Sequence, residues 1–256
     1  MGRRRGGDKL HNKKKELEKK DFQRKTNDKA TVPDVIIACE DSVSSPTYFQ
    51  KIIDKLIEDK RITQDSFIIV SHSGKTHPTG VLEDLKNYSD ENNKKYTDFE
   101  HKWIVIDRDM ERVNGGGHTA EDFNNAIKNA KSKRKDLNIE VAYSNDSFEL
   151  WYLLHFDYRS TAILRDEIIK KVIEKLKKVE PHKFSKLNKD NIKEKNYTQM
   201  IFDTLLDKQE IAINNAKNLL SFHGSSHNPE QDNPATKVHI LVETLNNLGM
   251  SNKSSQ

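Results

Sequence analysis

The chain contains 256 residues, of which 34% are hydrophobic and 33% are charged, and its formal net charge is +4. Its longest apolar runs, such as "WYLLHF", are much shorter than the roughly 20 residues of a membrane-spanning helix, so we expect a cytoplasmic protein without membrane contact. The basic start "MGRRRGGDK" lacks the apolar region of a secretory signal. The single cysteine, Cys39, excludes an intramolecular disulfide and a structural zinc site made of cysteines.

Residues 1–30 are rich in Lys and Arg. One interpretation is a solvated tail with frayed ends, which charge runs at chain termini often are. The other is a flexible arm that binds phosphates, because Lys and Arg release counterions when they contact nucleic acid. For the second interpretation the candidate nucleic-acid-binding residues are Arg3, Arg4, Arg5, Lys13 and Lys14.

Residues 31–158 are predicted to form an α/β domain, since short apolar runs alternate with amphipathic stretches. Residues 35–39 are typical of a buried strand, and Pro46 suits the first turn of the helix that follows. Further strands are expected in "SFIIV", "KWIVID" and "NIEVAYSN". Further helices are expected in "GVLEDLKNYSDEN" and after Thr119. Thr119 would cap the second of these helices, with Asp122 in the capping-box position. Strands that alternate with helices favour a parallel sheet.

Residues 159–250 are predicted to form a helical part. Two long charged helices are expected at 161–179 and 197–221. A last helix is expected in "NPATKVHILVETLNNLG", where Asn233 would cap and Pro234 would occupy the first turn. A basic run between residues 170 and 195 has helical texture and is interpreted as a solvated helix face.

Acidic side chains follow two of the predicted strands. The first strand ends in Glu40, and the third in Asp107 and Asp109, within the stretch "HKWIVIDRDMER". Acids end many strands simply because loops are exposed to water. Binding sites of parallel sheets, however, lie at the carboxyl ends of the strands, and if these two strands are neighbours the carboxylates meet there. Their repulsion would then favour a bound Mg²⁺ or Mn²⁺, since Mg²⁺ is a hard cation that binds one or two carboxylates and keeps several waters.

A third polar group follows the fourth predicted strand, in "SNDSFELWYLLHF". Asp146 or Ser147 would cap a helix formed by this stretch. Glu149 interrupts an otherwise apolar run, so its side chain is a candidate catalytic group that turns toward the other acids. His155 is interpreted as a buried histidine at the edge of the core.

Two loops are candidates for contact with substrate. "GKT" at residues 74–76 resembles the end of a nucleotide-binding P-loop, but the earlier glycine is absent, which excludes that motif. Lys75 or His72 remains a candidate for binding phosphate. The glycine loop "NGGGH", residues 114–118, is either a gating loop or only a turn.

Glu40 with Asp107-x-Asp109 resembles the Toprim pattern of topoisomerases, primases and OLD-type nucleases. The blocks "IIACEDSVSSPTYF", "SNDSFELWYLLHF" and "NPATKVHILVETL" together resemble the RloB family over residues 34–245. The family more often has Gly in place of Asp41 and Asn-Pro in place of Asn145-Asp146. The resemblance implies a Toprim-like core, a role in bacterial anti-phage defence by abortive infection, and an ABC- or SMC-like ATPase as partner. Related defence effectors cut nucleic acid, with tRNA among their targets, so the resemblance also implies a nucleic-acid substrate.

The expected function is that of a metal-dependent nuclease. Asp107 and Asp109 would bind the metal, Glu40 would be a ligand or a general base, and RNA is favoured over DNA by the family resemblance. The alternatives are a DNA endonuclease of the same chemistry, phosphoryl transfer through an aspartyl-phosphate, and a non-catalytic adaptor that binds nucleic acid or the ATPase. A topoisomerase or primase is not expected, because the extra domains that those enzymes need do not fit in this chain. A homo-oligomer is compatible with every one of these.

Overall fold

The computed structural model describes residues 34–71, 73–74, 76–112 and 115–250, and from residue 34 onward these belong to one compact unit. The expectations for the basic arm, for His72 and for Lys75 therefore lie outside the described residues. No helix within these described ranges combines the length and the apolar character needed to cross a bilayer.

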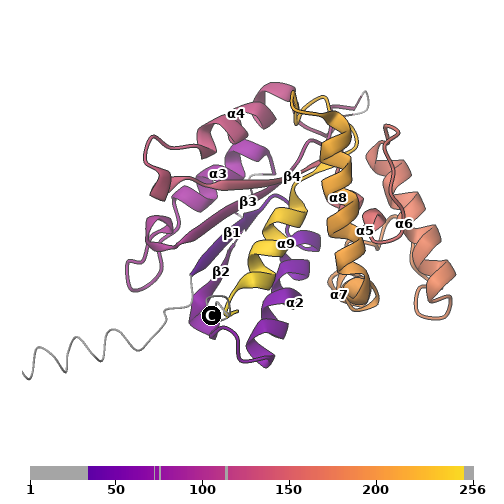
Figure 1. Ribbon diagram of the computed structural model, residues 1–256, viewed down its shortest axis with the longest axis horizontal. Helices are drawn as coiled ribbons and strands as arrows, with labels where there is room; N and C mark the ends of the chain where they lie inside the picture. The colour runs from indigo at the N-terminus through magenta and orange to yellow at the C-terminus, as the bar shows by residue number, and fades with distance from the viewer. Residues whose placement is uncertain (1–33, 72, 75, 113–114, 251–256) are drawn as a thin grey trace, which may run out of the picture. The chain divides into compact units, whose positions relative to one another are not determined.

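The described strands form one sheet in the order β2-β1-β3-β4-β5 (Figure 1). Strands β1 to β4 run parallel to their neighbours, and β5 is antiparallel to β4. The predicted α/β fold, a mostly parallel sheet flanked by helices and consistent with a Toprim-like core, is confirmed. The strands are β1 (Val35–Cys39), β2 (Phe67–Val70), β3 (His101–Asp107), β4 (Glu140–Asn145) and β5 (Ala235–Thr236).

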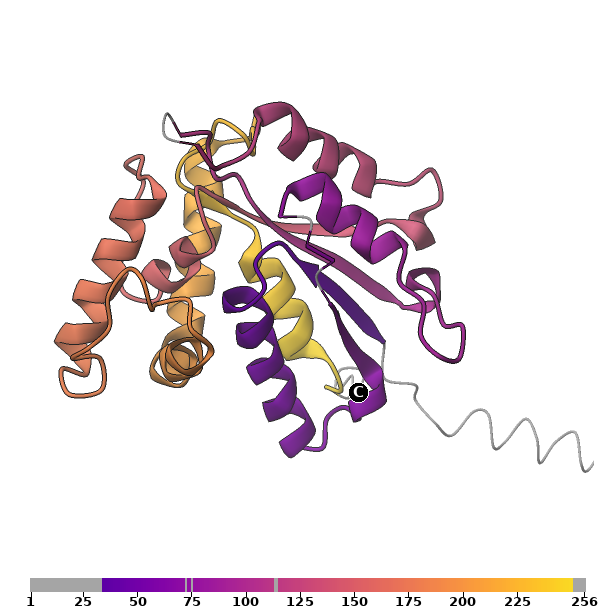
Figure 2. The same ribbon diagram turned by 180° about the vertical axis from the view of Figure 1, so that it is seen from behind.

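Helices cover both faces of the sheet. Helices α3 and α4 pack on one face and α2 and α9 on the other, while α5 to α8 lie beyond β4 (Figure 1 and Figure 2). Short 3₁₀ turns occur at Gln64–Ser66, Tyr96–Asp98, Lys135–Leu137 and Leu206–Lys208. The helices are α2 (Ser44–Glu58), α3 (Pro78–Lys86), α4 (Ala120–Ala130), α5 (Glu149–Leu154), α6 (Arg165–Val179), α7 (Lys195–Leu205), α8 (Gln209–His223) and α9 (Val238–Asn247).

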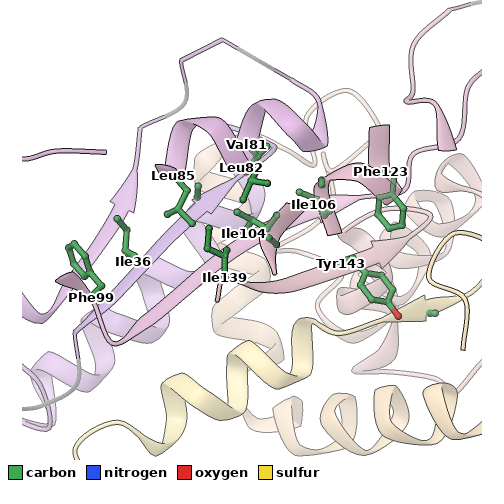
Figure 3. Packing of buried hydrophobic residues seen from close by; sticks show 14 residues of the cluster. Ile36, Val81, Leu82, Leu85, Phe99, Ile104, Ile106, Phe123, Ile139 and Tyr143 are labelled. Atoms are coloured by element: carbon green, nitrogen blue, oxygen red, sulfur yellow. The ribbon is translucent and has the colours of Figure 1, made fainter. Parts of the chain in front are cut away.

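The alternation of side chains along the strands builds the core. Ile104 on β3 pairs with Ala38 of β1, and Ile36 lies two positions before Ala38, so Ile36 and Ile104 share one face of the sheet. They belong to one buried cluster that also contains Leu85 of α3 and Phe123 of α4 (Figure 3). All of these side chains are fully buried, and each contributes about 2 kcal/mol by leaving water. This packing holds β1 and β3 side by side and so fixes where their carboxyl ends lie.

Several predicted helix boundaries are wrong. The helix expected to reach Asn92 ends at Lys86, and the helix expected at 197–221 is divided by a 3₁₀ turn into α7 and α8. The basic run is helical only as far as Val179, and residues 181–194 form turns instead of a solvated helix face.

The expected start of the last helix is also wrong. Ala235 and Thr236 form strand β5, paired with Asn145 and Ser144, and α9 begins only at Val238. The Thr236 hydroxyl donates to the Tyr143 carbonyl over 3.0 Å. Ala235 and Thr236 therefore pair with the edge of β4 before the helix begins. The predicted helical part thus supplies one strand to the sheet, and the predicted boundary near residue 158 falls in the segment between α5 and α6.

The helix caps give a mixed outcome. Thr119 caps α4 as predicted, accepting from the Asp122 amide over 3.1 Å, but the Asp122 carboxylate binds Thr79 at the start of α3 instead of closing a capping box. Neither Asp146 nor Ser147 caps α5, which begins at Glu149.

Candidate functional site

The carboxyl ends of β1 and β3 bring Glu40 and Asp107 together. Cys39 pairs with Val105, and the Glu40 amide continues the pairing by donating to the Val105 carbonyl over 2.9 Å. The Glu40 carboxylate in turn accepts from the Asp107 amide over 2.9 Å. The two acids therefore lie at adjacent strand ends, as the sequence predicts, and at the edge of the sheet where parallel α/β folds bind ligands.

A cleft of about 670 Å³ opens at this edge. Its volume lies within the range of about 300–1,000 Å³ that is common for small-molecule sites. Residues from both halves of the chain line it. Its acidic and basic members are Glu40, Asp41, Asp107, Asp109, His77, His118, Arg165 and Lys193.

Asp107 is the acid whose charge is least compensated in this cleft. Burial raises its pKa well above the usual range, and the charges of Glu40 and Glu149 raise it further, while Lys193 offsets only part of this. Among the described residues, none donates a hydrogen bond to the Asp107 carboxylate. A cation beside this carboxylate would relieve the unfavourable energy of its charged form.

Glu40 is held in place by His118, whose Nε2 contacts the Glu40 Oε1. Burial alone would lower the pKa of His118, but the hydrogen bond and charge of Glu40 raise it overall. The glycine loop makes this contact possible. A Cβ on Gly117 would lie 2.5 Å from the Met110 carbonyl oxygen, so only glycine lets the loop turn back onto the segment that follows β3.

Asp109 is placed differently from Asp107. Strand β3 ends at Asp107, so strand alternation does not extend to Arg108 and Asp109, and Asp109 has a φ of 30°. Its carboxylate accepts from Arg112 Nη2 over 2.9 Å and from Arg165 Nη1 over 2.8 Å. Arg108 is buried and donates to the His118 carbonyl over 2.9 Å, which braces the glycine loop.

Glu149 lies behind the cleft instead of lining it. Only 1% of its side chain is exposed, and its Oε1 is 3.2 Å from Lys193 Nζ. Burial would raise the pKa of Glu149, but the nearby charges of Lys193 and Arg165 lower it overall, so Glu149 is charged. The predicted catalytic acid is thus the buried partner of a lysine that does reach the cleft.

Asp41, by contrast, makes its hydrogen bonds to residues that follow closely in the sequence. Its carboxylate accepts from the amides of Val43 over 3.0 Å and Ser45 over 3.1 Å, and it contacts the Ser45 hydroxyl. These bonds stabilise the start of α2, where a negative charge is favourable. Asp41 therefore has a structural task even though it borders the cleft.

The pair Glu40 and Asp107 fits a divalent cation of the Mg²⁺ class. Within the described parts of the chain, no three His, Cys, Asp or Glu side chains are grouped as a complete ligand set. Mg²⁺ does not require one, because it commonly binds through one or two carboxylates and keeps several waters. The uncompensated Asp107 carboxylate beside Glu40 has the chemistry that such an ion prefers.

A family model described as RloB-like protein matches residues 35–245. The chain belongs to this family. A search of curated proteins and a search of solved structures each found no match. The family range includes every cleft residue named above, from Glu40 to Lys193, whereas the basic arm lies outside it.

Sequence reasoning missed three basic residues of this cleft. His118 ends the glycine loop, and the available signal was that this loop closely follows the two predicted ligands Asp107 and Asp109. Arg165 and Lys193 come from the helical part, and Lys193 lies in the run interpreted as solvated. His155, as predicted, is buried outside the cleft, with its Nδ1 2.8 Å from the Trp151 carbonyl oxygen.

Proposed function

We propose that this RloB-like chain is a metal-dependent nuclease in which Asp107 and Glu40 hold Mg²⁺ or Mn²⁺. The observation that carries the proposal is Asp107, whose poorly compensated charge faces an open cleft beside a second carboxylate. When bound, the cation supplies Lewis-acid polarisation of the scissile phosphate and a water of lowered pKa.

The protein's own residues supply orientation and proton transfer. The Asp107 amide donates to Glu40 Oε2, and His118 Nε2 contacts Glu40 Oε1, so both carboxylate oxygens are oriented. If Asp107 alone holds the cation, Glu40 would act instead as the general base, with Oε1 taking the proton of an attacking water and His118 stabilising the result. Removing either side chain should slow cleavage, since general acid–base groups typically contribute about 10²–10⁴-fold.

The biological setting is part of the proposal and is the one that the resemblance to the family implies. The nuclease would act in the bacterial cytoplasm as an effector of anti-phage defence, with RNA such as tRNA as the favoured substrate. An ABC- or SMC-like ATPase would control it, and a homo-oligomer is compatible with this setting. A DNA endonuclease of the same chemistry is the main alternative.

The test is a cleavage assay of the full chain on total RNA and on plasmid DNA, with Mg²⁺, Mn²⁺ or EDTA, and with and without any ABC- or SMC-like ATPase that proves to be encoded nearby. Cleavage should require metal and should be lost in Asp107→Asn and Glu40→Gln. The control is Asp65→Asn, which changes an exposed acid outside the cleft and should leave cleavage intact.

Two results would contradict the proposal. Cleavage that persists in EDTA or in Asp107→Asn excludes the metal mechanism. A stable phosphate adduct on Asp107 would favour phosphoryl transfer instead, and cellular defence that survives both substitutions would favour a non-catalytic adaptor.

A further inference from the structure

The geometry points to Arg165 and Lys193 as the phosphate-binding residues of the cleft, held by the buried carboxylates Asp109 and Glu149. The inference rests on the proposed function for the identity of the ligand, a phosphodiester group of nucleic acid. It gives Asp109 and Glu149, which the sequence predicts as metal ligand and catalytic acid, the task of positioning two cations.

Arg165 begins helix α6 and is fixed at two points. Its backbone amide donates to Asp146 Oδ2 over 3.0 Å, which anchors the start of the helix. Its Nη1 donates to Asp109 Oδ2 over 2.8 Å. The Arg165 side chain is 22% exposed, compared with 10% for Asp109, so the acid lies deeper and the guanidinium faces the cleft.

Lys193 repeats this arrangement from the turn before α7. Its Nζ is 3.2 Å from Glu149 Oε1, and its side chain is 33% exposed while that of Glu149 is 1% exposed. The acid cannot reach a ligand in the cleft, because the lysine covers it. The pair therefore presents a positive charge to the cleft and keeps the negative charge behind it.

The contrast among the acids supports this division of tasks. Asp109 has two guanidinium partners and Glu149 has an ammonium partner. Asp107 has no such ion pair among the described residues. Glu40 contacts His118, and Asp109 and Glu149 have the cations named above, so Asp107 is the acid at which a metal would supply the missing positive charge.

The cleft-facing surfaces of the two cations suit phosphate oxygens. A guanidinium binds phosphate through parallel hydrogen bonds, and an ammonium acts as a compact point charge. Both lie in the same cleft as the Asp107 and Glu40 pair, so one phosphate group can meet the metal-binding acids and the cations together. Fixed cations of this kind stabilise the charge that develops on a phosphate during cleavage.

The experiment measures binding of a fluorescently labelled single-stranded RNA oligonucleotide to the full chain in EDTA, where metal binding and cleavage do not contribute. We expect Arg165→Gln and Lys193→Gln each to weaken binding by about tenfold at low salt, an effect equal to about 1.4 kcal/mol. Each should also reduce the slope of log K against log salt concentration by about 0.7, as expected when one phosphate of a single strand is no longer neutralised. Lys193→Arg should retain binding. The matched control is Lys171→Gln, a partly exposed cation on α6 outside the cleft.

A second measurement separates the cations from the metal ligands. Calorimetry should show that Arg165→Gln and Lys193→Gln still bind Mn²⁺, whereas Asp107→Asn does not. Lys193→Gln leaves Glu149 buried without a partner and is expected to lose stability. The double variant Glu149→Gln/Lys193→Gln removes both charges and should fold. Its affinity for the oligonucleotide should be as low as that of Lys193→Gln.

The two proposals fail differently. Wild-type affinity and salt slope in Arg165→Gln and in the double variant would overturn the phosphate assignment, even if the chain proves to be a nuclease. Weakened binding without any metal-dependent cleavage would support the phosphate assignment and count against the nuclease.

Discussion

The Asn233 side chain donates to the side chain of Asn145 over 3.2 Å, although the two residues are 88 positions apart in the sequence. Asn145 is completely buried at the end of β4, and its Nδ2 also donates to the carbonyls of Pro229 and Glu230. Asn233 in turn accepts from the Ile163 amide over 2.8 Å. These bonds join the end of the sheet to two segments of the helical part.

Asn145→Ala should therefore lower the free energy of unfolding by about 3 kcal/mol. The substitution leaves several buried carbonyl and amide groups without a partner, and each such group costs about 1–3 kcal/mol. Urea denaturation measures the change. Asn124→Ala is the control, since it removes an exposed bond to Glu230 and should change stability by less than about 0.5 kcal/mol. Equal stability of both variants would show that this junction is not important for the fold.

Asp107→Asn should bind Mn²⁺ at least about tenfold more weakly. Substituting a residue that only hydrogen-bonds to a metal ligand already has an effect of this size, and Asp107 is a proposed ligand itself. Without metal, the variant should be more stable than the wild type at neutral pH, by on the order of 1 kcal/mol, because repulsion from Glu40 and Glu149 is relieved. The pKa of Asp107 is raised in the folded state, so wild-type stability relative to the variant should fall as the pH rises above about 4. Calorimetry in Mn²⁺ and thermal denaturation in EDTA test the two parts. Unchanged metal affinity would remove Asp107 from the site.

Gly117→Ala should disturb the cleft more than Gly115→Ala. Both glycines have a φ near 85–90°, so both substitutions introduce a similar backbone strain of about 1 kcal/mol. Only at Gly117 does the added Cβ also meet backbone atoms, at 2.5 Å and 2.6 Å from the carbonyl oxygens of Met110 and Asp109. Nuclease activity should fall at least about tenfold in Gly117→Ala alone, because His118 is moved away from Glu40. Equal activity of the two variants would show that the loop does not position His118.

The sequence predicts the part of this site that depends on local patterns. Apolar runs followed by acids place Glu40 and Asp107 at strand ends, and the alternation of strands with helices places those ends at one edge of a parallel sheet. The cap at Thr119 is predicted for the same reason, since it depends on residues three positions apart.

What the sequence does not predict depends on contacts between distant segments. Arg165 meets Asp109 across 56 positions, and no local pattern distinguishes it from the other charged residues of its helix. Strand β5 is only two residues long, and it exists because Thr236 bonds to the buried edge of β4. The position of Asp109 does not follow from strand alternation, because β3 ends two residues before it.

His155 should make the protein less stable in mild acid. Burial lowers its pKa to about 4, and its side chain is 1% exposed. The unfolded chain, with a pKa near 6.5, binds a proton that the folded chain does not, so the contribution of His155 is full above about pH 6.5 and is lost as the pH falls toward about 4. The shift corresponds to about 3 kcal/mol. The loss of stability between pH 7 and pH 4.5 should be smaller in His155→Gln than in the wild type, whereas His182→Gln, an exposed control, should follow the wild type.

Deletion of residues 1–29 tests the remaining sequence prediction, the basic arm. If this arm binds phosphates through Arg3, Arg4, Arg5, Lys13 and Lys14, its removal should weaken RNA binding. The slope of log K against log salt concentration should become shallower by about 0.7 for each phosphate of a single strand that is no longer neutralised. The decrease should exceed the value of about 0.7 expected for Arg165→Gln, because the arm would neutralise several phosphates at once. Replacing the five residues by Gln, at unchanged chain length, controls for the absence of the segment itself. The free energy of unfolding should hardly change in either variant. An unchanged salt slope would identify the segment as a solvated tail and would leave nucleic-acid binding to the cleft.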